Sequence, residues 1–295
     1  MFKEVAFDPS ALSNIEYYYL LKREFGFDKG RYVSADLKSW VSEAVESVKK
    51  SDLQPVKKSS IKSFLNKLLK GRPDKKVCIE LKQRSKVKAK PWENWLQEQN
   101  QILPFSLVVS EKGKFNSVNI DELDDDLDAW GVPPSKSVLG TTANIVDFLM
   151  PMLVLGKSVV IVDPYFKLAS NPVLLEILKI LSGSQVTRVL VYSSIENSNP
   201  RMIYEQQYSH IIQDRFEFCW YLMPLKHYHD RHFITDIGAI RSGAGFSEVV
   251  PKGANADYLN FNLVSKNEAE RVLRDIKNDG ARGIIEQTFT NLPET

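Results

Sequence analysis

Residues 142–166 read TANIVDFLMPMLVLGKSVVIVDPYF, and the fold class of the second half of the chain follows from them. Thr142 to Leu155 is an apolar run of helical length, and Gly156 ends it. Ser158 to Val162 contains four consecutive β-branched residues, which predicts a buried strand that ends at Asp163. A helix followed directly by a buried strand is typical of an α/β domain.

The same alternation continues toward the C-terminus. We expect helices over Pro172–Leu181, Pro200–Gln213 and Lys266–Asn278, and strands over Thr187–Tyr192 and Phe216–Leu222. This spacing predicts an α/β sandwich with a mostly parallel sheet. The run from Asp121 to Ser137 contains two consecutive prolines and is the expected boundary, which gives an N-terminal region at 1–135 and an α/β domain at 136–295.

The N-terminal region is expected to be mainly helical, with a few strands. A helix from Ala11 to Phe25 would follow Pro9, because proline suits the first turn of a helix. A second helix is expected after Ser59-Ser60, where apolar residues recur at helical spacing up to Gly71. Strands are expected at Val77–Leu81 and Phe105–Val109, and a short helix is expected after Pro91.

The composition is that of an ordinary globular protein. Of 295 residues, 43% are hydrophobic and 26% are charged, which excludes a wholly disordered chain. Two cysteines exclude a disulfide framework and a cysteine-rich zinc site. The longest apolar stretch, Phe148 to Leu155, is too short to cross a bilayer, and the N-terminus has no secretory apolar segment. We therefore expect a soluble, cytoplasmic protein.

Charge is unevenly distributed along the chain. From Lys49 to Lys90 there are 15 lysines and arginines against 3 acids, while the whole chain carries a net charge of only +2. This basic block is either a solvated helix face with a lysine-rich loop, or a footprint for phosphate backbones or an anionic membrane. Residues Asp121 to Asp128 form an acidic block that lacks the glycine and glutamate of an EF-hand loop. We expect it to be an acidic loop that could dock the basic block in the same or a second subunit.

The chemistry is concentrated in residues 225–236, LKHYHDRHFITD, which hold three of the four histidines. If this segment is a strand, His227, His229 and Arg231 share one face, because side chains alternate. An imidazole beside a guanidinium suits phosphate chemistry, since the histidine attacks phosphorus or moves a proton while the cation holds phosphate oxygens. Asp236 could orient an imidazole and stabilise its charged form.

These residues resemble the His-x-Lys-x4-Asp motif of phospholipase D-like enzymes. His229, Arg231 and Asp236 have that spacing, and Gly243-Ala244-Gly245-Phe246 follows at the distance of a second glycine-rich segment. The strand ending in Asp163-Pro164-Tyr165-Phe166 is similar to the first strand of such a domain. The resemblance covers Thr141 to Asp279 and implies a phospholipase D-like α/β sandwich at the C-terminus.

The chain departs from the enzymes of this family in two ways. Arg231 replaces the lysine, and Ala244 and Phe246 stand where a hydroxyl and an amide are usual. In these respects the sequence is similar to the C-terminal domain found beside MIT domains, which binds phosphoinositide membranes without expected catalysis. It is also similar to bacterial defence-associated proteins of the phospholipase D-like type.

The resemblance implies a metal-independent phosphodiesterase without a cofactor. The leading hypothesis is a nuclease that acts on DNA or RNA. It implies His229, Arg231 and Asp236 as catalytic residues. The substrate-binding residues it suggests are Ser242, Gly243, His227, Asp163 and Tyr165. Family enzymes pair two motifs, one histidine forming a phosphohistidine and the other protonating the leaving group. Because this chain holds one motif, an active site would need a homodimer.

Other readings remain open. The chain could be a catalytically inactive phosphate-binding or protein-interaction module, with a partner protein in a bacterial defence complex or at a membrane. It could also be a lipid phosphodiesterase. His227, His229 and His232 could bind zinc, although His232 would point away on a regular strand. In a purely structural reading, Asp230 and Arg231 pair locally on an edge strand, and Asp163 is a turn residue.

Overall fold

The computed structural model describes residues 1–71, 76–84, 90–105, 107–111, 116–124, 127–225, 228–249 and 257–292. The chain divides into two compact units, unit 1 from Met1 to Val132 and unit 2 from Pro133 to Thr295. The division falls just before the two consecutive prolines of the Asp121–Ser137 run. Among the described residues, no helix has the length and apolar character needed to cross a membrane.

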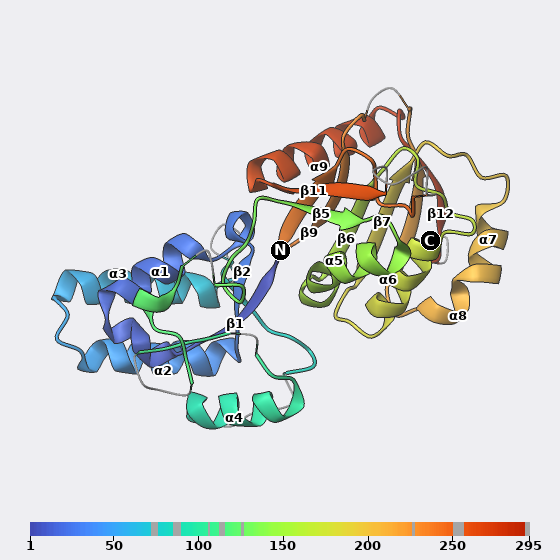
Figure 1. Ribbon diagram of the computed structural model, residues 1–295. Coiled ribbons are helices and arrows are strands. Elements are labelled where there is room, and N and C mark those ends of the chain that lie inside the picture. Colours follow the sequence, from blue (N-terminus) through green and yellow to red (C-terminus); the bar gives the residue numbers. More distant parts are fainter. Residues whose placement is uncertain are drawn as a thin grey trace. The chain divides into compact units, whose positions relative to one another are not determined.

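Unit 1 is an α/β unit built on a small parallel sheet with the strand order β3-β2-β1-β4 (Figure 1). Its strands are β1 (Lys3–Phe7), β2 (Arg31–Ser34), β3 (Cys78–Ile79) and β4 (Val108–Val109). Its helices are α1 (Ile15–Glu24), α2 (Leu37–Lys50), α3 (Pro55–Leu69) and α4 (Trp92–Ile102). Short 3₁₀ helices lie at Pro9–Ser13, Phe27–Lys29 and Ile120–Glu122.

The two central strands of this sheet, β1 and β2, were not predicted from the sequence. One helix was expected from Ala11 to Phe25, whereas a 3₁₀ helix is separated from α1 by Asn14. Asn14 has an extended backbone, and its side chain accepts a hydrogen bond from the backbone N–H of Glu16, so it begins a new helix. Helix α3 starts at Pro55, earlier than expected, because proline occupies its first turn.

Unit 2 is built on an eight-stranded sheet with the order β12-β8-β7-β6-β9-β10-β11-β5. Its strands are β5 (Ser135–Leu139), β6 (Ser158–Val162), β7 (Arg188–Ser193), β8 (Glu217–Leu222), β9 (Arg231–Thr235), β10 (Gly238–Ser242), β11 (Tyr258–Val264) and β12 (Glu286–Thr290). Its helices are α5 (Thr142–Leu155), α6 (Pro172–Ser182), α7 (Pro200–Gln207), α8 (Ser209–Ile212) and α9 (Lys266–Ala281). The α/β class expected for this half of the chain is confirmed.

The expectation of a mostly parallel sheet is wrong, because the sheet of unit 2 is mixed. Strands β6, β7 and β8 run parallel, but β9 pairs antiparallel with β6 and the remaining pairs are also antiparallel. The physical reason is the tight turn between Thr235 and Gly238, which joins β9 and β10 as a hairpin instead of through a helical crossover. The expected helix Pro200–Gln213 is likewise divided at Tyr208.

Helices cover both faces of this sheet (Figure 1). On one face Phe148 of α5 stacks on Phe261 of β11, and Phe246 stacks on the same ring. On the other face Glu268 of α9 lies against His232 of β9. Side chains of β9 alternate between these faces, so Arg231 and Phe233 point toward the α5 side and His232 toward α9.

Candidate functional site

The end of β6 meets the open end of the β9–β10 hairpin, which is distant from β6 in sequence, at one end of the unit 2 sheet. Asp163 follows the last residue of β6, Arg231 begins β9, and Ser242 ends β10. The strand register sets these positions, because Val162 pairs with His232 and Arg231 pairs with Ser242. The structure therefore brings together five residues that the sequence singled out, namely Asp163, Tyr165, Arg231, Ser242 and Gly243.

Asp163 is the buried centre of this cluster, with 1% of its surface exposed. Its Oδ1 accepts a hydrogen bond from the backbone N–H of Tyr165 (3.0 Å), and its Oδ2 accepts one from that of Phe246 (3.1 Å). Nε of Arg231 lies 3.5 Å from Oδ1. Burial raises the pKa of Asp163, and this outweighs the two N–H groups and Arg231, which lower it. Asp163 thus contacts the loop after β6, the loop after β10 and the Arg231 side chain at once.

Arg231 is held on three sides, with 17% of its side chain exposed. Nη1 donates a hydrogen bond to the carbonyl of Gly243, and the guanidinium lies 4.9 Å from the centroid of the Tyr165 ring. Stacking on an aromatic ring and contact with a carboxylate both favour one orientation of the guanidinium. Within the described residues, no group accepts a hydrogen bond from Nη2.

The loop after β10 closes the cluster through its backbone. Ser242 is fully buried, and its Oγ accepts hydrogen bonds from the backbone N–H groups of Ala244 (3.3 Å) and Gly245 (3.0 Å). Gly245 has φ +94°, and a Cβ there would lie 2.5 Å from Oδ2 of Asp163. A glycine is required at this position for both reasons. Gly243, in contrast, is exposed and has open space around it.

His229 lies outside the strand that carries Arg231. It is exposed and precedes Arg231, the first residue of β9, by two positions. The alternation that was expected to place His227, His229 and Arg231 on one strand face therefore does not apply, because the strand begins only at Arg231. His227 is outside the described residues. Between His229 and the other described residues, no hydrogen bond or ion pair is found.

The role expected for Asp236 is corrected. It lies in the turn after β9, at the other end of the strand from Arg231, and a five-residue strand spans roughly 16 Å. Its Oδ1 accepts a hydrogen bond of 2.6 Å from the backbone N–H of Lys157, just before β6. Asp236 therefore fastens the β9–β10 turn to the start of β6 and cannot orient the imidazole of His229 in the same subunit.

The other charged residues of the motif face α9. His232 is 4% exposed, and its Nε2 lies 3.7 Å from Oε1 of Glu268. Burial lowers the pKa of His232, although Glu268 opposes this shift. Oδ2 of Asp230 lies 3.5 Å from Nη1 of Arg241. The local ion pair between Asp230 and Arg231, which the purely structural interpretation of the motif expects, is therefore not formed.

The structure also separates two of the histidines that were considered as zinc ligands. His232 is buried beneath α9, whereas His229 is exposed before the strand. In the part of the chain that the structure describes, no three His, Cys, Asp or Glu side chains are grouped as metal ligands. The described part of the motif thus centres on Arg231 and the buried carboxylate of Asp163.

Sequence reasoning missed the contributions of Gly245 and Phe246. The backbone N–H of Phe246 donates to Asp163, and the missing side chain of Gly245 makes room for that carboxylate. The Gly-x-Gly-Phe segment was the available signal, but its partner lies 83 positions away in sequence.

No protein-family model matches this sequence, and no curated protein matches it either. Among solved structures, it is similar to polyphosphate kinase from Porphyromonas gingivalis, with 12% identity, a TM-score of 0.37, and coverage of 49% of this chain and 26% of that one. It is also similar to phosphatidylserine synthase from Haemophilus influenzae Rd KW20, with 15% identity, a TM-score of 0.38, and coverage of 55% and 40%. The chain thus spans less than half of either protein, and at these values neither similarity carries a functional argument.

Proposed function

We propose that unit 2 binds a phosphodiester at the end of the sheet where Asp163, Arg231 and the Ser242–Phe246 loop meet. The observation that supports this proposal most directly is the arrangement of Arg231. Its fork is held against Asp163, Gly243 and the Tyr165 ring, while Nη2 has no acceptor among the described residues. A cation held in one orientation loses little conformational freedom when it binds a phosphate oxygen, which favours binding. Tyr165 is 53% exposed and can contact the group attached to that phosphate.

The activity that suits this site is metal-independent phosphodiester hydrolysis of the phospholipase D-like type, with a nucleic acid as substrate. A neutral imidazole of His229 attacks phosphorus, a P–N bond forms, and the P–O bond to the leaving alcohol breaks. A second histidine gives its proton to that oxygen. It then takes a proton from a water molecule, which attacks phosphorus and releases the imidazole. Arg231 stabilises the negative charge on the non-bridging oxygens.

We infer that the second histidine comes from a second copy of the chain, because neither of the other two histidines that the structure describes is placed to supply it. His232 is buried under α9, and His210 lies on α8, which leads into the start of β8, whereas Asp163 follows the end of the parallel strand β6. His227 lies outside the described residues. We propose a twofold homodimer in which His229 of each subunit faces a shared phosphate. The exposure of His229 is compatible with such a site, because the side chain is accessible to a partner.

The test is a nuclease assay on single- and double-stranded DNA and RNA in the presence of EDTA. Wild type is compared with His229→Ala and with the matched control His210→Ala, a surface histidine outside the motif. The proposal expects cleavage by wild type and His210→Ala and its loss in His229→Ala. Cleavage that persists in His229→Ala would refute the assignment of the nucleophile.

A second candidate is a phosphate-binding or protein-interaction module without catalysis, in a defence complex or at a membrane. The observation that favours it is that Asp236 is too distant to orient His229, so no described carboxylate supports that imidazole. In this case the purified protein binds a phosphodiester analogue through Arg231 but cleaves no polymer. Equal affinity of wild type and His229→Ala for the analogue, together with loss of binding in Arg231→Ala, would identify this function.

A further inference from the structure

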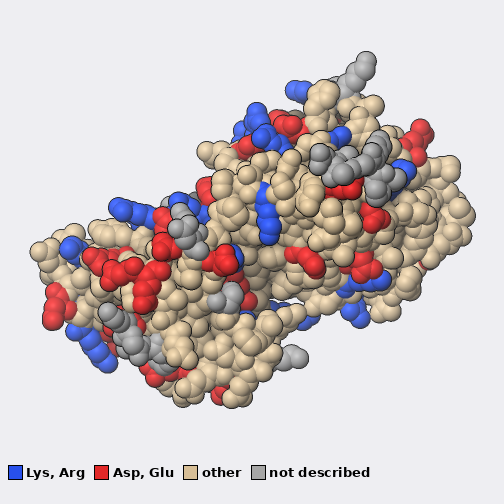
Figure 2. All heavy atoms as spheres, in the orientation of Figure 1, with Lys and Arg blue, Asp and Glu red and all other residues tan. Residues whose placement is uncertain are grey.

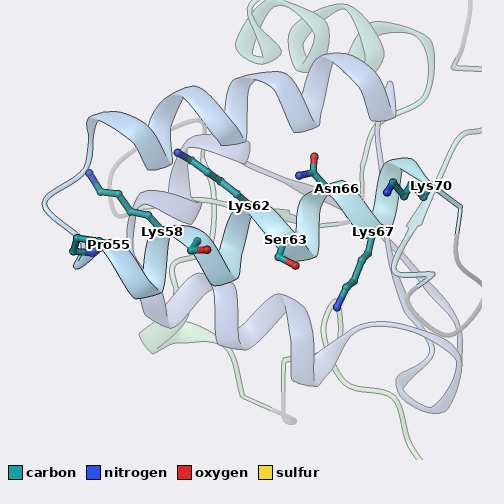
Figure 3. A pocket seen from close by; sticks show the side chains of 8 residues that line it. Pro55, Lys58, Lys62, Ser63, Asn66, Lys67 and Lys70 are labelled. Carbon is teal, nitrogen blue, oxygen red and sulfur yellow. The ribbon is translucent and has the colours of Figure 1, made fainter.

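Helix α3 of unit 1 presents lysines along its exposed face. A shallow groove of about 660 Å³ follows this face, and its lining comes from one helix. The lining residues are Pro55, Lys58, Ser59, Lys62, Ser63, Asn66, Lys67 and Lys70. Figure 3 shows Lys58 and Lys62 reaching toward one side of the helix and Lys67 toward the other. The groove is therefore bordered by cations on both sides, with hydroxyl and amide groups between them.

The opposite face of α3 fixes these cations in place. Ile61, Phe64, Leu65 and Leu68 are buried in the core of unit 1, so the helix cannot rotate without exposing them. A second groove of about 460 Å³ lies between α3 and α1, where Lys22 and Tyr18 of α1 join residues of α3. The cationic surface thus extends across two packed helices. We call it the α1/α3 face, defined by Lys22, Lys58, Lys62, Lys67 and Lys70.

Few acids neutralise this face. Helix α3 carries no Asp or Glu in its sequence. In the described parts of the chain, Lys62, Lys67 and Lys70 form no ion pair with a carboxylate. Glu46 of α2 interacts with Lys62 only weakly. The pKa of Glu46 is lowered mainly by Lys49, whose Nζ lies 2.6 Å from its Oε1. Lys58 donates to a backbone carbonyl, that of Lys49.

Docking of the acidic block on the basic block, in the same or a second subunit, stays a prediction. Asp121 and Glu122 lie in a 3₁₀ helix capped by Asn119, and no ion pair joins the described acids of this block to a lysine of α3. Figure 2 shows a side of unit 1 on which Asp and Glu gather while Lys and Arg lie toward the margins. Because α3 carries no acid, the lysines of the α1/α3 face give it a net positive potential.

We propose that the α1/α3 face binds the phosphate backbone of a nucleic acid. From Lys58 to Lys70 the helix extends about 18 Å, which is long enough to contact several consecutive phosphates. The hydroxyls of Ser59 and Ser63 and the amide of Asn66 lie between the lysines and can donate to phosphate oxygens. Membrane-binding helices instead place Trp, Phe or Leu beside their cations. The lining of the 660 Å³ groove contains no such residue, and Phe64, which lines the smaller groove, is buried, while Leu69 is exposed at the end of α3.

The test measures binding separately from cleavage. A fluorescent single-stranded oligonucleotide and its duplex are titrated at several salt concentrations with the full chain carrying His229→Ala, which removes the proposed nucleophile. In this background, Lys62, Lys67 and Lys70 are changed to Gln. The matched control changes three exposed lysines of unit 2, Lys136, Lys179 and Lys277, to Gln. Both variants lose the same net charge, so a general electrostatic effect changes them equally.

The proposal expects a specific loss in the α3 variant. Three lost phosphate contacts make the salt dependence shallower by about 2 in log–log slope for a single strand, at roughly 0.7 per contact. Relative to a reference at about 1 M salt, that slope corresponds to binding about 100-fold weaker at about 0.1 M salt. The unit 2 control should keep the wild-type slope. Equal slopes for the two variants, or strong binding to phosphatidylserine vesicles without binding to the oligonucleotides, would overturn the proposal.

A second measurement needs no substitution in α3. Photocrosslinking of a bromouracil-containing oligonucleotide to the full chain should label peptides that include residues 55–70. Labelling confined to unit 2 would contradict the proposal. This inference does not depend on the proposed activity, because binding is measured without His229. If the nuclease assay fails but the oligonucleotide still binds, only the proposed catalysis is refuted. If the α3 variant and the unit 2 control have equal salt slopes, only the proposed binding by the α1/α3 face is refuted.

Discussion

Replacing Gly245 with alanine should disrupt the candidate site through one added methyl group. A Cβ at this position would lie 2.5 Å from Oδ2 of Asp163 and 3.1 Å from Cδ of Arg231. The first contact is shorter than side chains tolerate, so either the Asp163 carboxylate or the loop must move. In either case the hydrogen bond from the Phe246 N–H to Asp163, which is buried, is lost.

The cost follows from two terms. The backbone of residue 245 has φ +94°, and this conformation costs an alanine roughly 1–3 kcal/mol. A buried donor or acceptor left without a partner costs a further 1–3 kcal/mol, approximately. We therefore expect Gly245→Ala to lower the free energy of unfolding of unit 2 by about 2–6 kcal/mol, which is a large part of the stability of an ordinary domain.

Gly243→Ala is the matched control, because it adds the same methyl group to the same loop. A Cβ at Gly243 has no neighbour within 4 Å, and its backbone is not in the left-handed region. Urea denaturation followed by circular dichroism measures both variants. Gly245→Ala should unfold at distinctly lower urea and bind a phosphodiester analogue more weakly, while Gly243→Ala should match wild type. Coincident unfolding curves for the two variants would refute this account of the loop.

Three further predictions concern single side chains. Asp236→Ala should lower the free energy of unfolding by about 1 kcal/mol, because the Lys157 N–H loses its acceptor, and leave affinity for a phosphodiester analogue unchanged in a fluorescence titration. Tyr165→Ala should weaken that affinity by roughly 2–5-fold, the equivalent of about 0.5–1 kcal/mol of cation–π contact with Arg231, whereas Tyr165→Phe should not. Burial lowers the pKa of His232, so the unfolded chain binds more protons and wild-type stability should fall as the pH drops below about 6.5. Urea denaturation across this range should show a smaller decrease for His232→Gln, and an equal decrease would contradict the shift.

Much of unit 2 follows from its sequence because local signals agree there. Helix α5 and strand β6 have the expected boundaries, since Thr141 caps the helix, Gly156 ends it, and a run of β-branched residues follows. Strand β1 in unit 1 has no such signal. Its sequence, KEVAF, is short, and it is buried only because β2 and β4 pair with it from distant parts of the chain. Pairing of this kind is set by tertiary structure rather than by local propensity.

Some residues of the candidate site could likewise be predicted from the sequence, and others could not. Arg231, Asp163 and Ser242 could be selected from motif spacing and strand ends, and the structure places them together. The position of Asp236 could also have been foreseen, because a strand that starts at Arg231 carries Asp236 to its other end. The contact of Gly245 and Phe246 with Asp163 could not, since it depends on which strand of the sheet lies next to which.

The central claim is that His229 forms a covalent bond to phosphorus during phosphodiester cleavage. Rapid alkaline quenching of wild type mixed with an end-labelled oligonucleotide in EDTA tests it directly, because phosphohistidine survives alkali. The account predicts a protein–nucleotide adduct that is lost in acid and maps by mass spectrometry to the peptide containing His229. Cleavage without an adduct, or an adduct on another residue, would contradict it.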